Sequence, residues 1–114
     1  MAEKILVVDD EPLVLSAIEK ALSKVGYVIV KAQNKKEFIS ALRQSPFNML
    51  ITDVYMGWNT ADGIISEVKD LSPSIKVLCI SGSVDKNRTY PFLEKPFRIG
   101  DLRKKVRDIL DELP

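Results

Sequence analysis

Three short segments of the chain contain only apolar residues, and each is followed by polar residues. The segments are residues 5–8, 49–51 and 77–80. A strand that is apolar throughout, instead of alternating, is typical of a parallel strand covered on both faces. We therefore predict that these segments form the centre of a parallel sheet, with the weaker segments 27–30 and 92–93 as outer strands.

Apolar residues between and after the strands recur every three or four positions, as on one face of a helix. The four sets are Val14, Ile18, Ala21 and Val25; Phe38, Ala41 and Leu42; Ile64, Val68 and Leu71; and Ile99, Leu102, Val106, Ile109, Leu110 and Leu113. Gly26 suits a helix C-terminus, and Asn34 with Glu37 suits a helix N-terminus. Alternating strands and helices predict one doubly wound α/β domain over residues 1–114, whose ligands bind at the carboxyl ends of the strands.

The composition excludes several kinds of chemistry. The chain has no histidine, so it has no Ser-His or Cys-His nucleophile pair and cannot carry phosphohistidine. With 17 basic and 16 acidic residues, the net charge gives no reason to expect nucleic acid or a membrane surface as a partner. The only cysteine, Cys79, lies in an apolar segment and is expected to be a buried thiol. The first apolar segment is too short for a signal peptide or a membrane span, so we expect a cytoplasmic protein.

Charged and hydroxyl side chains follow each of the predicted strands. Asp9, Asp10 and Glu11 come directly after the first strand, Asp53 after the third and Ser81 after the fourth, while Lys95 follows the weak fifth strand. The carboxyl ends of parallel strands meet at one edge of a sheet. We therefore expect these side chains to converge in one crevice.

Several carboxylates at one site repel one another, and a divalent cation relieves this repulsion. Oxygen ligands alone favour Mg²⁺. A metal ion, a carboxylate and a lysine at one site are groups that phosphoryl transfer uses, and Asp53 would be the attacking carboxylate. The hydroxyl of Ser81 and the ammonium of Lys95 can each bind a phosphoryl oxygen.

Four short motifs resemble, in the same order, the signature regions of response-regulator receiver domains. They are residues 5–12 (ILVVDDEP), 53–56 (DVYM), 80–82 (ISG) and 94–97 (EKPF). The resemblance implies a flavodoxin-like sheet of five parallel strands in the order 2-1-3-4-5. It also implies a phosphoacceptor protein of a two-component system, which switches its interactions with a downstream protein. The phosphoryl donor would be a phosphohistidine on a sensor histidine kinase or a histidine phosphotransfer protein.

The same resemblance implies roles for individual residues. Asp10, Asp53 and the backbone carbonyl of Tyr55 would bind Mg²⁺, and Asp9 would act through a bound water. Ser81 would change its position when phosphate binds.

Phe92 resembles the aromatic residue that changes rotamer together with that hydroxyl, although it could equally be a plug at the sheet edge. The peptide bond between Lys95 and Pro96 is expected to be cis, as in the family. The chain would catalyse only its own phosphorylation and a slow dephosphorylation, and it would not be an enzyme in the usual sense.

The sequence departs from the family pattern in the region of the fourth helix. Residues 85–89 are polar without an apolar stripe, and Pro91 would interrupt a helix there. We therefore predict that helix four is shortened to a turn or absent.

A second departure follows the acceptor. Gly57 stands where the family usually has proline, and the loop from there to Asp62 is lengthened, which predicts a mobile, reshaped rim. Trp58 in this loop is expected to be partly exposed, either for partner recognition or by chance. The bulk of Tyr55 suggests slow hydrolysis of the acyl phosphate.

Three other interpretations are open to the sequence. A receiver-like module could bind proteins without being phosphorylated. An aspartate-dependent phosphatase would need a nucleophile and an acid one residue apart, whereas Asp9 and Asp10 are adjacent. A flavodoxin-like nucleotide binder would need a glycine-rich or hydroxyl-rich loop after the first strand, where this chain carries acids that repel phosphate.

Overall fold

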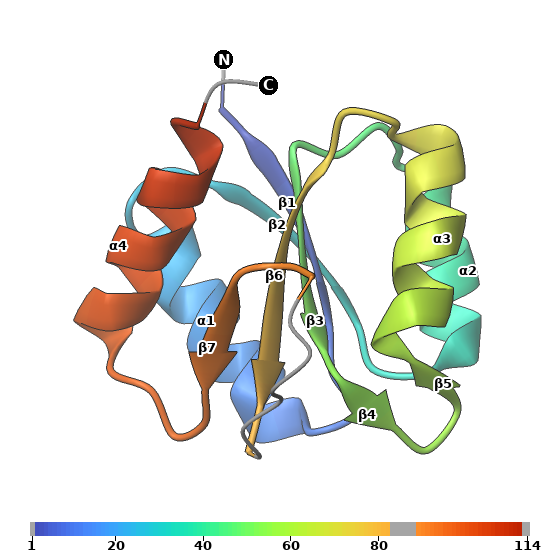
Figure 1. Cartoon of the computed structure of the whole chain (residues 1–114), viewed down its shortest axis with the longest axis horizontal. Coiled ribbons are helices and arrows are strands. Elements are labelled where there is room, and N and C mark those ends of the chain that lie inside the picture. Colours follow the sequence, from blue (N-terminus) through green and yellow to red (C-terminus); the bar gives the residue numbers. More distant parts are fainter. Residues whose placement is uncertain (1, 83–88, 113–114) are drawn as a thin grey trace.

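A five-stranded parallel sheet forms the centre of the molecule, and the computed structural model describes residues 2–82 and 89–112. Its strands are β1 (Lys4–Val8), β2 (Val28–Ala32), β3 (Met49–Asp53), β6 (Lys76–Ser81) and β7 (Phe92–Glu94). They lie in the order β2-β1-β3-β6-β7 (Figure 1). Counted along the chain within this sheet, that is the predicted order 2-1-3-4-5, which is thereby confirmed.

Helices cover both faces of the sheet. α1 (Pro12–Ser23) and α4 (Ile99–Leu110) lie on one face, and α2 (Lys35–Leu42) and α3 (Ala61–Leu71) lie on the other (Figure 1). These are the four helices within the described ranges. Between β6 and β7, the described residues 82 and 89–91 belong to no helix. The sequence predicts that helix four is shortened to a turn or absent around residues 85–89. Of these residues, only Thr89 belongs to the described part of the chain.

The core consists of two apolar layers, one on each face of the sheet. Successive residues of β1 enter different layers: Ile5 and Val7 pack towards α1 and α4, whereas Leu6 and Val8 pack towards α2 and α3. All four side chains are fully buried. Burial on both faces is the reason why residues 5–8 of this strand are all apolar.

The end of α1 corrects two boundaries expected from the sequence. Gly26 has φ +101°, and its amide and that of Tyr27 donate to the carbonyls of Ser23 and Leu22. These two bonds form a Schellman motif, which ends the helix. Tyr27 therefore belongs to the helix end instead of β2, and Val25, beyond the regular turns of α1, is 51% exposed instead of buried.

Two further predicted core residues are half exposed because each stands at the end of its helix. Leu71 is the last residue of α3, and Ile99 is the first of α4. A helical stripe is buried only where the helix overlies the sheet. The last helix ends at Leu110, and Leu113 lies outside the described residues.

Directly after β3, the chain forms a short antiparallel hairpin of β4 (Tyr55–Met56) and β5 (Asn59–Thr60). The sequence predicts a mobile, reshaped loop here, and the structure corrects the loop to a hairpin with regular pairing. Thr60 also caps α3, since its hydroxyl accepts a bond from the amide of Gly63. Pairing with β5 and capping of α3 thus give the segment a regular structure.

Candidate functional site at the carboxyl ends of the strands

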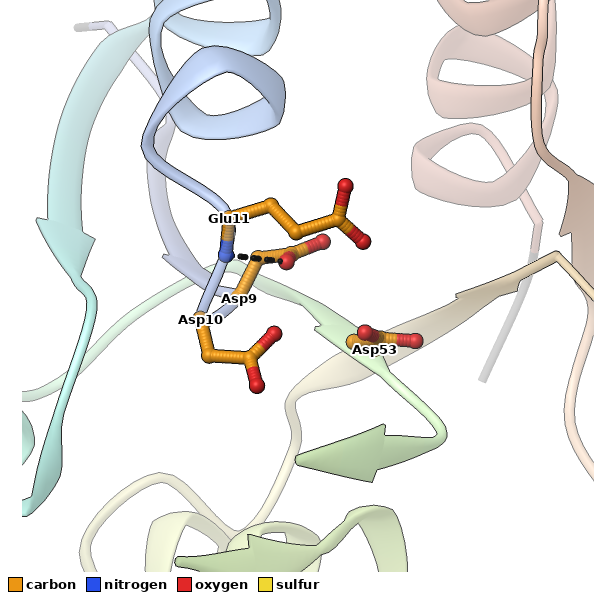
Figure 2. A group of neighbouring side chains, drawn as sticks. All are labelled: Asp9, Asp10, Glu11 and Asp53. Carbon is orange, nitrogen blue, oxygen red and sulfur yellow. Dashed lines mark hydrogen bonds between the residues drawn. The ribbon is translucent and has the colours of Figure 1, made fainter. Parts of the chain in front are cut away.

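The polar residues singled out in the sequence gather at one rim of the sheet. Asp9, Asp10 and Glu11 join β1 to α1, and Asp53 ends β3 opposite them (Figure 2). Ser81 ends β6, and Lys95 directly follows β7. Since each lies at the carboxyl end of a parallel strand, the topology alone brings them to one edge.

The ammonium of Lys95 is the centre of this group. Its Nζ lies 2.9 Å from Oδ2 of Asp9, 3.1 Å from Oε1 of Glu11 and 3.3 Å from Oδ2 of Asp53. The ammonium of Lys95, which follows β7, therefore links the carboxyl ends of β1 and β3. Lys95 itself is held in place because its backbone amide donates to the carbonyl of Ser81 at 2.7 Å.

Backbone amides bind one oxygen of each of the three aspartates. Oδ1 of Asp9 accepts a hydrogen bond from the amide of Glu11 at 2.9 Å, and Oδ1 of Asp53 accepts one from the amide of Val54 at 2.8 Å. Oδ2 of Asp10 accepts a longer bond, 3.4 Å, from the amide of Gly57 in the hairpin. The acids are thus oriented before any ligand arrives, which is a requirement for effective electrostatic catalysis.

Burial and charge act in opposite directions on the pocket's ionisable groups. Asp9 is fully buried, and this burial raises the pKa of Asp9 more than the hydrogen bond from Lys95 lowers it. Burial also disfavours charged Lys95, but its hydrogen bonds to Asp9 and Glu11 outweigh this, so the pKa of Lys95 is raised. Lys95 therefore remains a cation.

Four carboxyl groups meet one ammonium in this pocket. Single oxygens of Asp9, Asp10, Glu11 and Asp53 all lie within 4.8 Å of one another. An excess of negative charge at such distances favours a bound cation, and an all-oxygen donor set suits Mg²⁺. The residues present therefore fit the metal that the sequence suggests.

The other residues expected at the site have the following places. Ser81 is buried at the end of β6, and Phe92 is buried in the apolar layer under α2 and α3. The peptide bond between Lys95 and Pro96 is cis. The side chain of Tyr55 is exposed on β4.

A family model decides to which group of proteins the chain is related. The model of the response regulator receiver domain matches residues 5–107. The chain belongs to this receiver-domain family. Receiver domains are generally regulatory, and this membership is consistent with a place in two-component signalling.

Individual relatives show how far the likeness extends. The response regulator receiver protein CpdR of Brucella abortus is 26% identical over 95% of this receiver domain and 97% of its own length. The response regulator protein PilR of Pseudomonas aeruginosa is 29% identical, but the receiver domain spans only 26% of it. The crystal structure of a response regulator from Thermotoga maritima is 26% identical, with a TM-score of 0.84 over 98% of this chain and 100% of that chain.

Two contacts of the receiver domain are absent from the sequence-based picture. Glu11 is expected there only as part of the acidic group, whereas it forms an ion pair with Lys95. Gly57 is expected as a loop residue, whereas its amide reaches Asp10. No pattern in the sequence indicates the ion pair between Glu11 and Lys95. The polar residues 59–60, which precede an apolar helical stripe, could have indicated that the segment with Gly57 ends in a helix cap.

Among the described residues of the receiver domain, no helix has both the length and the apolar character needed to cross a membrane.

Proposed function

We propose that this receiver domain accepts a phosphoryl group on Asp53 from a phosphohistidine of a sensor histidine kinase or a histidine phosphotransfer protein. The observation that carries the proposal is the position of Asp53, which is nearly buried beside Lys95 and faces the acidic loop after β1. Phosphorylation would then switch the protein-protein interactions of the domain in the cytoplasm. Its net charge supports neither nucleic acid nor a membrane as a direct partner.

In the proposed step, a carboxylate oxygen of Asp53 attacks phosphorus. A P–O bond forms, and the P–N bond to the donor imidazole breaks. Lys95 exchanges contacts with carboxylates for a contact with a phosphoryl oxygen, and the hydroxyl of Ser81 binds another. The backbone bond between Lys95 and Ser81 supports these roles, because it keeps the two residues side by side at the rim.

Mg²⁺ would neutralise charge on the phosphoryl oxygens when it is bound. Asp10, Asp53 and the backbone carbonyl of Tyr55 would hold it, and Asp9 would act through a water. The bond from Gly57 to Asp10 supports this set, because it brings the hairpin that carries Tyr55 to the acidic loop.

After phosphorylation, Ser81 and Phe92 would form the switch. The register of β6 and β7 places Cys79 beside Phe92 and Ser81 beside Glu94, so both switch residues lie on neighbouring strands. A movement of the Ser81 hydroxyl can therefore be transmitted to Phe92 across one strand pair. The domain would catalyse only its own phosphorylation and a slow dephosphorylation, as a regulator.

The test is incubation with Mg²⁺ and acetyl phosphate, followed by mass spectrometry of the intact chain. The expected result is a labile increase of one phosphoryl group that depends on Mg²⁺ and is missing in Asp53→Asn. Asp70→Asn, which changes an exposed acid of α3, is the matched control and should retain the adduct. A wild-type chain without adduct would contradict the proposal and favour an interaction module that works without phosphorylation.

A further inference from the structure

Trp58, the only tryptophan of the chain, holds the tip of the β4–β5 hairpin. Its indole Nε1 donates to the backbone carbonyl of Gln33, between β2 and α2, at 3.2 Å. Its ring lies against the ring of Phe38 in α2, with centroids 5.7 Å apart. One side chain thus fastens the segment after the phosphoacceptor to a corner of the sheet far away in the sequence.

The base of the hairpin is fixed independently of Trp58. The amide of Val54 donates to the carbonyl of Ile80 in β6, and the amide of Ala61 donates to the carbonyl of Val54. Beyond this base, each strand has only two residues. Such a short hairpin is marginal by itself, so the position of its tip depends on packing.

The alternation of an antiparallel ladder shows which edge of the hairpin carries the carbonyl of Tyr55. The bond from Ala61 to Val54 flanks the pair Tyr55–Thr60, which is therefore a non-hydrogen-bonded pair. The backbone groups of Tyr55 then point away from β5. Two residues later, the amide of Gly57 donates to Asp10. The outer edge of β4 therefore faces the acidic loop.

From these contacts we infer that Trp58 is a positioning residue for the metal site, a role that rests on the proposed function. By fastening the hairpin tip to Gln33 and Phe38, it holds the outer edge of β4 against Asp10. The carbonyl of Tyr55 and the carboxylate of Asp10 are thereby prepared to share one cation. Trp58 touches neither the cation nor the phosphoryl group in this role.

The test is a titration with Mg²⁺ alone, followed through the amide resonance of Asp10 in isotope-labelled protein. Trp58→Ala should weaken Mg²⁺ binding roughly tenfold, as loss of a supporting group around a metal site typically does. Trp58→Phe retains a ring against Phe38 but lacks the hydrogen bond to Gln33. Its affinity for Mg²⁺ should therefore fall less than that of Trp58→Ala.

The matched control is Ile75→Ala. Ile75 belongs to the same apolar layer as Phe38 but precedes β6, at the opposite end of the strand from Ser81. This variant should lower Tm and leave the Mg²⁺ dissociation constant unchanged. If Trp58 only stabilised the fold, the affinity for Mg²⁺ would instead fall together with Tm in all the variants.

Two failures are distinguishable. If the wild type shows no response to Mg²⁺, the proposed function itself fails. If the wild type binds and the Trp58 variants bind equally well, or if Ile75→Ala weakens binding as much as they do, the inference about Trp58 is overturned. Should Trp58→Ala not fold, Trp58→Phe decides by the same criterion.

Discussion

At the scale of single residues, Lys95 offsets part of the negative charge of the pocket. Its ammonium lies within 3.3 Å of oxygens from Asp9, Glu11 and Asp53. Without this cation, the buried carboxylates of Asp9 and Asp53 would face each other unpaired. Ionised groups that lose their partner in a poorly solvated site destabilise the folded state strongly.

Lys95→Ala is therefore expected to lower the free energy of unfolding by roughly 2–4 kcal/mol in buffer without Mg²⁺. Adding Mg²⁺ should recover part of the loss, because the metal would neutralise the same carboxylates. Urea denaturation with and without Mg²⁺ measures both effects. Lys104→Ala removes an exposed ion pair with Asp108 and should change stability far less than Lys95→Ala does. Equal losses in the two variants would contradict the role of Lys95.

The raised pKa of Asp9 predicts how the stability of the domain depends on pH. Because burial raises the pKa of Asp9 above 3.8, folding disfavours its ionised form. The contribution of Asp9 to the free energy of unfolding therefore falls as pH rises from below 3.8 through the raised pKa. Asp9→Asn lacks this penalty, so without Mg²⁺ it should have the higher Tm at neutral pH, and the gain should shrink as pH falls towards about 4. A gain that does not vary with pH would exclude this cause.

At the scale of secondary-structure elements, the end of α1 depends on a conformation that favours glycine. Gly26 has φ +101°, and nothing lies within 4 Å of where its Cβ would be. Gly26→Ala should therefore cost about 1–2 kcal/mol through the backbone alone. Gly100→Ala, in the first turn of α4 with equally open surroundings, should be neutral or stabilising by up to about 1 kcal/mol. Thermal denaturation of both variants checks the contrast, and equal Tm shifts would refute it.

The long elements could be predicted from the sequence, whereas the short hairpin could not. β1 and β6 are visible because burial on both faces makes their residues 5–8 and 77–80 apolar without interruption. β4 and β5 have only two residues each, too few to show any periodicity. The contacts of Trp58 at their tip reach Gln33 and Phe38, which lie close to it only after folding.

At the scale of the whole molecule, topology accounts for the part of the site that could be predicted. Asp9, Asp53, Ser81 and Lys95 each lie at the carboxyl end of a strand, and a parallel sheet must bring such residues to one edge. The pairing of Glu11 with Lys95 depends on side-chain directions that no sequence pattern encodes. No sequence pattern indicates which edge of the β4–β5 hairpin faces Asp10 either.

The central claim is that Asp53 carries the phosphoryl group, and mapping the modified residue tests it most directly. The chain is phosphorylated with acetyl phosphate and Mg²⁺ and then reduced with borohydride, which converts an aspartyl phosphate to homoserine. Peptide mass spectrometry should locate homoserine at position 53 alone. Homoserine at Asp9 or Asp10, or unmodified aspartate at all three positions, would contradict the claim.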